Sequence, residues 1–329
     1  MKNIVEKHLW LELSEDAQRQ YVDARAVFTA WESAKKSAAE VRGGMHWQSK
    51  SGHDYLFRTS AAGAQKSLGP RSAETEQIYQ SFVERKKQVE KRVADLSTEL
   101  IRHQKMNRAL GVGHAPRILI DILQKLSSSG LAEFFTVVGT HALYAFESSS
   151  GVFIGEQEAL ATRDIDLLWD IRKRLSFLTK MEILDTSFIG LLKKVDSTFE
   201  LRQDQRHTAV NSKGFEVDII RREAKDVDPH PLTLTDDDGD FFVVQARKAG
   251  LLLDSARFSS MVVSTSGHMA RMNTISPAAF AKFKRWLAVQ PDRDAQKRRR
   301  DILQAELVEE LIREYLPTEV SEPVPWTQV

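Results

Sequence analysis

The stretches FFTVVGTHALYAF, residues 134–146, and ATRDIDLLW, residues 161–169, decide the fold of this chain. The first begins with a short run of aromatic and β-branched residues, which Gly139-Thr140 interrupts before a helix-like segment. This order predicts a strand, a tight turn and the start of a helix. The second stretch alternates polar and apolar residues with the period of a strand. We therefore expect two strands with a turn and a helix between them.

Two carboxylates are held side by side in the second stretch. Asp164 and Asp166 alternate with Ile165 and Leu167, so in a strand both carboxylates leave one face while the apolar side chains enter the core. Two like charges so close are costly unless a cation lies between them. Hard oxygen ligands suit Mg²⁺, which takes its remaining ligands from water and substrate phosphates. The pair therefore indicates either a metal site for phosphoryl transfer or the solvated edge of an amphipathic strand.

Three neighbours favour the metal site. The Gly139-Thr140 turn offers backbone N–H groups and a hydroxyl to a phosphate. Another strand-like run, residues 215–220, supplies Asp218 between β-forming residues, and Arg163 lies next to the first pair. We expect a third carboxylate beside the first two.

The identity of the third acid has alternatives. Glu216 shares a face with Asp218 under strand alternation, and Glu200 lies in the preceding strand-like run. We prefer Asp218, because Val217 and Ile219 bracket it in the same way that apolar residues bracket the second aspartate of the first pair.

These residues resemble a known family. The Gly139-Thr140 turn, the Asp164-x-Asp166 pair and the later Asp218 are similar to the glycine-serine turn, the Asp-x-Asp pair and the third aspartate of the DNA polymerase β type nucleotidyltransferase superfamily. Within it, the chain resembles a bacterial branch with a nucleotidyltransferase fold and, more distantly, the nucleotidyltransferase toxins of toxin–antitoxin pairs.

The resemblance covers about residues 116–220, with weaker similarity continuing to the C-terminus, and two departures accompany it. Thr140 stands where serine is usual. The separation between the turn and the first aspartate is longer than in compact members, which implies an inserted loop at roughly residues 147–162.

The resemblance implies an activity and a ligand set. A nucleoside monophosphate would pass from a nucleoside triphosphate (NTP), such as ATP, to a hydroxyl of an RNA such as tRNA, of a protein or of a small molecule. The three aspartates would be the catalytic residues and would hold two Mg²⁺ ions, with Mn²⁺ as a substitute. A cognate antitoxin is the implied protein partner; separately, the amphipathic pattern of residues 75–106 is compatible with a homodimer. The implied nucleotide-binding residues are Gly139, Thr140, Arg163 and Lys284.

Two other functions remain open. The fold could bind nucleotide as a regulatory module without turnover. Alternatively, the chain could bind nucleic acid through residues 41–110, which carry about 13 Lys and Arg against about 7 Asp and Glu. In that part, Trp47, Tyr55, Arg58 and Lys66 either stack on bases and hold phosphates or belong to a small hairpin packed on neighbouring helices.

The composition is typical of a soluble globular protein with two or three core-bearing units, since 42% of the 329 residues are hydrophobic and 28% are charged. The absence of cysteine excludes disulfides, thiolate zinc sites and thiol nucleophiles. No apolar run approaches the roughly 18 to 20 residues that span a bilayer, and the first residues lack a signal-peptide cleavage pattern. We expect a cytoplasmic protein without a membrane partner.

The patterns predict an α+β fold in three regions. Residues 1–110 form a helical region with a small β-hairpin, residues 111–245 form a core with a mixed β-sheet flanked by helices, and residues 246–329 form a helical region. An acidic run, DDDGD at residues 236–240, lacks the ligand spacing of a calcium loop and is expected to be solvated. The main predicted helices are 14–41, 75–106, 116–128 and 276–286 with a further one up to 316, and the main predicted strands are 199–202, 208–210, 215–220 and 241–244.

Overall fold

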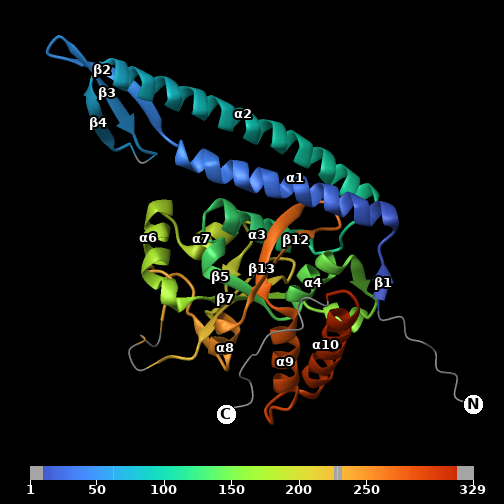
Figure 1. The fold of residues 1–329 in the computed structure, drawn as a ribbon. Helices are drawn as coiled ribbons and strands as arrows, with labels where there is room; N and C mark the ends of the chain where they lie inside the picture. The colour runs from blue at the N-terminus through green and yellow to red at the C-terminus, as the bar shows by residue number, and fades with distance from the viewer. Residues whose placement is uncertain (1–9, 62, 226–227, 229–231, 317–329) are drawn as a thin grey trace, which may run out of the picture. The chain divides into compact units, whose positions relative to one another are not determined.

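The computed structural model describes residues 10–61, 63–225, 228 and 232–316 (Figure 1). It divides into two compact units. The sheet unit comprises Met1–Gln18 and Gly111–Val329, and the hairpin unit comprises Arg19–Leu110. Strands and helices occur in both units, which confirms the predicted α+β class.

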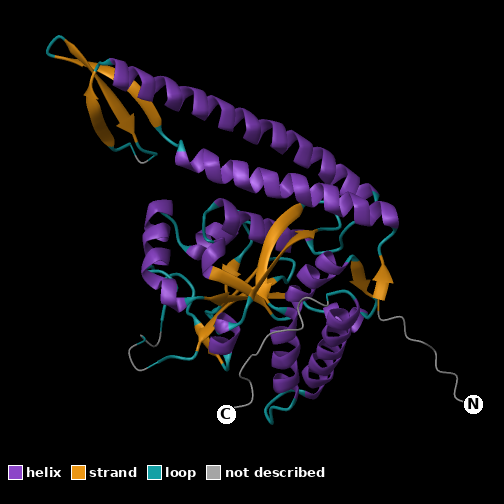
Figure 2. Ribbon diagram, in the orientation of Figure 1, coloured by secondary structure: helices purple, strands orange, loops and turns teal. Residues whose placement is uncertain are grey.

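The hairpin unit is built from two long helices with a small sheet between them in sequence (Figure 2). Gln20 of the first helix donates from Nε2 to Oδ1 of Asn107 in the second at 2.8 Å, and the Trp31 indole donates to Ser97 at 3.0 Å. The sheet has three antiparallel strands, the predicted hairpin and one further strand beside it. The elements are α1 (Glu15–Glu40), β2 (Gly44–Lys50), β3 (His53–Thr59), β4 (Gln65–Pro70) and α2 (Ala73–Ala109).

The sheet unit is organised around a mixed sheet of eight strands in the order β12-β13-β5-β7-β10-β9-β8, with β11 also beside β10. The central pair, β7 and β10, is parallel, and β5 lies antiparallel on the other side of β7. The strands are β5 (Phe135–Val138), β7 (Asp164–Trp169), β8 (Glu200–Leu201), β9 (Thr208–Val210), β10 (Glu216–Arg222), β11 (Val244–Ala246), β12 (Arg257–Val263) and β13 (Met269–Ile275).

Helices cover both faces of this sheet, and neighbouring residues of β7 point into different cores. Leu167 belongs to a core that contains apolar residues of α3, α6 and α7, whereas Leu168 belongs to a second core with α4, α8, α9 and α10. Figure 1 shows α9 and α10 side by side. The helices are α3 (Arg117–Ser128), α4 (Leu143–Ser150), α5 (Gln157–Leu160), α6 (Arg174–Leu184), α7 (Phe188–Lys193), α8 (Ala249–Asp254), α9 (Pro277–Ala288) and α10 (Ala295–Glu314).

Three details differ from the sequence-based expectations. The pattern predicts no strand in 257–275, yet β12 and β13 extend the sheet beyond β5. The implied loop at residues 147–162 contains α5 and a short strand, β6 (Val152–Ile154), which pairs with β1 (Trp10–Glu12). The prediction that the DDDGD run is solvated is wrong for Asp240, which is fully buried and accepts hydrogen bonds from the first two N–H groups of α7, at 2.7 and 3.0 Å. A carboxylate at a helix N-terminus satisfies donors that the helix itself cannot.

One threonine connects the unpredicted strands to the centre of the sheet. Thr274 of β13 is fully buried beside Val137 of β5, and its hydroxyl donates to the Val137 carbonyl oxygen at 2.6 Å. We expect Thr274→Val, which keeps the shape but removes the donor, to lower the free energy of unfolding by about 1–2 kcal/mol. Urea denaturation checks this, with Thr274→Ser as the control that retains the hydroxyl. Equal stability of the valine variant and wild type would contradict the prediction.

Candidate metal centre

Three aspartates converge at the start of the central parallel strands. Asp166 of β7 lies directly opposite Asp218 of β10 in the strand register, and Asp164 precedes Asp166 by two residues on the same strand face. One carboxylate oxygen from each of the three lies within 4.8 Å of the others. All three side chains are half-buried, so the oxygen atoms form a compact acidic cluster that solvent reaches. Hard oxygen donors in this arrangement fit a Mg²⁺ or Mn²⁺ ion.

The two alternative third acids lie outside this cluster. Glu216 is opposite Asp164 in the register, but its carboxylate is paired with the Arg202 guanidinium at 3.1 Å. Glu200 is exposed on β8 and pairs through its backbone with Val210 of β9. Of the three candidates, the geometry brings Asp218 to the first pair.

The cluster holds its protons unusually tightly. The pKa of Asp166 is raised to about 7, chiefly by desolvation and also by the neighbouring carboxylates of Asp164 and Asp218. Desolvation also raises the pKa values of Asp164 and Asp218. In the opposite direction, the Thr208 hydroxyl donates to Asp218 at 2.5 Å and favours its charged form. Because the raised values come from missing solvation and like charge, a divalent cation at this point would supply what the carboxylates lack.

Gly139 is required where β5 turns towards α4. Its φ of 69° lies in the left-handed region, and a Cβ atom there would overlap with Oδ2 of Asp166. The turn is therefore packed directly against the carboxylate cluster. The glycine turn thus lies beside the Asp pair.

Gln304 of α10 orients the hydroxyl of Thr140. Its Nε2 donates to the Ala159 carbonyl oxygen at 2.6 Å and to Thr140 Oγ1 at 3.1 Å. The Ala159 carbonyl oxygen can only accept a hydrogen bond, so the side-chain NH₂ group of Gln304 must point towards it. The same NH₂ group therefore donates to Thr140 Oγ1. The Thr140 hydroxyl proton is thereby left to donate elsewhere. Gln304 is fully buried, and its Oε1 has no hydrogen-bond partner among the described residues.

His141 forms a hydrogen bond with the backbone at the start of β7. It is buried against Phe215, and its Nδ1–H donates to the Asp164 carbonyl oxygen at 2.9 Å. Burial lowers the pKa of His141 to about 4, so the imidazole is neutral at pH 7. The residue thus fixes the backbone beside Asp164 without adding charge.

The expected nucleotide-binding cations occupy different settings. Lys284 of α9 is buried and its ammonium lies 3.0 Å from Asp301, which also pairs with Arg293 at 2.7 Å. The charges of Lys284 and Arg293 still act on Asp166, because both lower its pKa.

Arg163 is exposed directly before β7. Lys297 and Arg300 of α10 are the cations that lower the pKa of Asp164, and Arg300 also donates to the Ala161 carbonyl oxygen at 2.9 Å. These two lie in the basic run of the last helix, but nothing in the local pattern connects them, His141 or Gln304 to the aspartates.

The packing at Gly139 gives a matched comparison. Gly139 and Gly151 have φ values of 69° and 71°, but a Cβ at Gly151 meets its nearest neighbours at 3.7 Å or more. Both alanine variants therefore carry similar backbone strain, and we expect Gly139→Ala alone to displace Asp166. Mn²⁺ affinity, measured by electron paramagnetic resonance, should fall about tenfold or more in Gly139→Ala and stay near the wild-type value in Gly151→Ala. Equal Mn²⁺ affinities in the two variants would show that the packing of Gly139 against Asp166 does not affect metal binding.

The raised pKa of Asp166 gives a pH-dependent stability. In metal-free protein the carboxyl group titrates at about 7 when folded and near 3.8 when unfolded. Between these values the folded state holds a proton that the unfolded state lacks, so stability falls as the pH rises through this window. Asp166→Asn has no carboxyl group at this position, so its stability does not fall for this reason. In EDTA its melting temperature should exceed that of wild type by a margin that grows from about pH 4 to about pH 7 and then levels off. A melting-temperature difference that is constant with pH would argue against the raised pKa of Asp166.

Comparison with known proteins agrees with this geometry. A family model described as nucleotidyltransferase matches residues 117–325. Neither the curated proteins nor the solved structures contained a match. Among the helices that the structure describes, none has the length and apolar character needed to cross a membrane. The matched segment spans the glycine turn, all three clustered aspartates and the last two helices, and the chain accordingly belongs to this nucleotidyltransferase family.

Proposed function

We propose that the chain is a Mg²⁺-dependent nucleotidyltransferase that transfers a nucleoside monophosphate from an NTP to an acceptor hydroxyl. The observation that carries this proposal is the convergence of Asp164, Asp166 and Asp218 beside the Gly139 turn. Family membership supports transferase chemistry. The acceptor is a hydroxyl of an RNA, a protein or a small molecule.

The three aspartates would hold one or two divalent ions. A Mg²⁺ ion held there would supply charge neutralisation at the phosphate oxygens and would make the acceptor hydroxyl more acidic. Asp218 is our candidate to take the hydroxyl proton, because the Thr208 hydroxyl orients its carboxylate within the cluster. The acceptor oxygen then forms a bond to the α-phosphorus, the bond from that phosphorus to the bridging oxygen breaks, and pyrophosphate leaves.

The glycine turn and α10 would hold the triphosphate. Backbone N–H groups at the start of a helix lack partners within it and bind phosphate oxygens. The hydroxyl proton of Thr140, left available by Gln304, adds one donor. Lys297 and Arg300 bring positive charge to the side of Asp164 and are our candidates for the β- and γ-phosphates, together with the exposed Arg163.

In this proposal Lys284 does not bind the triphosphate directly. It is buried against Asp301, and it contributes through its field at Asp166, which favours the charged carboxylate that a metal requires. This makes Lys284 a positioning residue.

Labelling with each α-³²P-NTP tests the proposal. The purified chain is incubated with Mg²⁺, total RNA and lysate protein, and the RNA, protein and small-molecule fractions are counted separately. We expect label in one fraction, and a loss of about 100-fold or more in Asp166→Asn and Asp218→Asn. Asp121→Asn, a half-buried carboxylate on α3 outside the cluster, is the matched control and should label as wild type does.

Two results would contradict the proposal. Undiminished labelling by Asp166→Asn would remove the aspartates from the chemistry. Tight NTP binding that depends on Mg²⁺ but releases no pyrophosphate with any acceptor fraction would favour a nucleotide-binding module without turnover.

A further inference from the structure

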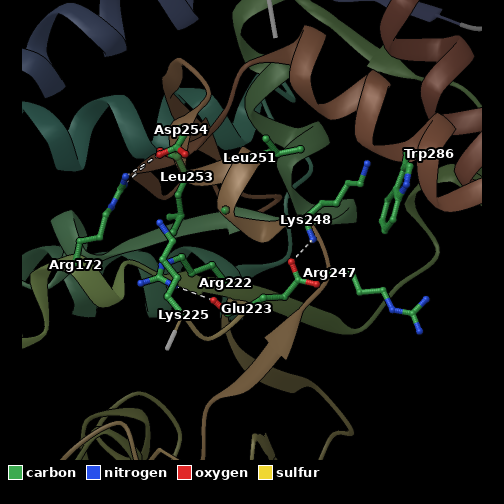
Figure 3. A pocket seen from close by; sticks show the side chains of 11 residues that line it. Arg172, Arg222, Glu223, Lys225, Arg247, Lys248, Leu251, Leu253, Asp254 and Trp286 are labelled. Atoms are coloured by element: carbon green, nitrogen blue, oxygen red, sulfur yellow. Dashed lines mark hydrogen bonds and ion pairs between the residues drawn. The ribbon is translucent and has the colours of Figure 1, made fainter. Parts of the chain in front are cut away.

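A second polar site lies at the opposite end of the central strands. A cavity of about 470 Å³, which we call the basic pocket, is formed by the end of β10 and the residues after it, by α8 and the residues before it, and by α9 (Figure 3). Arg222 in its wall is four residues beyond Asp218 on β10, about 13 Å along the strand. The pocket is therefore separate from the acidic cluster, and its volume is in the range of small-molecule sites.

Two of its arginines form the wall. Arg172 is held between the buried carboxylate of Asp170 and the exposed one of Asp254, at 2.7 Å from each. Arg222 pairs with Asp228 at 2.7 Å, with both side chains largely buried. Both arginines of the pocket wall are thus already held in ion pairs.

Two lysines carry charge that the described residues do not neutralise. No carboxylate of the described part of the chain lies within 4.0 Å of the Lys225 or Lys248 ammonium group. Lys248 instead extends along Trp286, with its Nζ 5.1 Å from the ring centroid (Figure 3). In the figure Lys225 comes from the other side of the pocket. An anion that enters from solvent meets positive charge on both sides.

The backbone of Lys248 has an unfavourable conformation. Its φ of 58° lies in the left-handed region, which is unfavourable for a residue other than glycine. The Glu223 carboxylate accepts a hydrogen bond from the Lys248 backbone N–H at 3.3 Å and supports this conformation. The conformation lets the lysine side chain run beside the tryptophan.

Part of the remaining wall is apolar. Trp286 is half-buried and stacks on Phe283 with ring centroids 5.8 Å apart and planes inclined by 22°. Leu251 and Leu253 of α8 complete this side of the pocket. A ligand that uses both walls combines an anionic group with a planar or apolar part, and the cavity is larger than an inorganic anion needs.

We propose that the basic pocket binds a nucleotide through its phosphate, at a site distinct from the acidic cluster. The phosphate is taken by the ammonium groups of Lys225 and Lys248, and the base packs on the Trp286 side. The nucleotide is either a free mononucleotide or the phosphorylated end of an RNA strand, since both present this chemistry. The proposal concerns binding and stands independently of any transferase activity.

Calorimetry in EDTA tests binding while the acidic cluster lacks metal. The ligands are AMP, adenosine, inorganic phosphate, and a short RNA with either a 5′-phosphate or a 5′-hydroxyl. We expect AMP or the 5′-phosphorylated RNA to bind and adenosine to bind at least about tenfold more weakly. Binding by AMP identifies a free nucleotide as the source, and binding by the phosphorylated RNA without AMP identifies a strand end.

Matched variants locate the site. Lys248→Asn removes the charge but suits a left-handed backbone, and Lys225→Gln changes an exposed side chain. Each should weaken binding of the phosphorylated ligand about tenfold. Lys193→Gln, which changes an exposed lysine at the end of α7, should bind as wild type does.

Other outcomes would overturn the proposal. Inorganic phosphate that binds as tightly as AMP would leave a simple anion site, and unchanged binding in both lysine variants with wild-type melting temperatures would place any nucleotide elsewhere. Absence of binding by every phosphorylated ligand would also refute it.

Discussion

The parallel pairing of β7 with β10 is the constraint on which the rest of the site depends. It sets Asp166 opposite Asp218, although 51 residues separate them in the sequence. Because side chains alternate along a strand, a shift of one residue in this register would turn one carboxylate into the core. The apolar residues Ile165, Leu167 and Val217, all fully buried, oppose such a shift. Core packing thus holds together three charges that repel one another.

The repulsion is moderated by cations that the fold places around the cluster. Asp301 is fully buried and paired with the buried Lys284 and the partly exposed Arg293, and both cations lower the pKa of Asp166. A buried pair is a costly arrangement in itself. Here it keeps positive charge at a fixed place near Asp166, where it favours the charged form of that carboxylate.

Much of the fold and the acidic cluster could be predicted from local patterns. Alternation in β7 predicts which side chains leave the sheet, and Gly139 marks the turn, because strand period and glycine geometry act within a few residues. The strands β12 and β13 were beyond this approach, since β13 is buried on most of both faces and shows no simple alternation. Buried polar residues such as Gln304 and Asp240 also escape prediction. Their partners, Thr140 and the start of α7, are distant in sequence, so each resembles an ordinary surface residue until the chain is folded.

Several of the residues that support the acidic cluster lie on one helix, α10. Lys297, Arg300, Asp301 and Gln304 follow one another at spacings of three, four and seven residues from the first, so one stripe of α10 faces the cluster. The charge beside Asp164, the anchor of the buried lysine and the support of the Thr140 hydroxyl all belong to this stripe. Substitutions confined to this one helix would therefore alter the surroundings of the cluster, while the strands that carry the acids stay as they are.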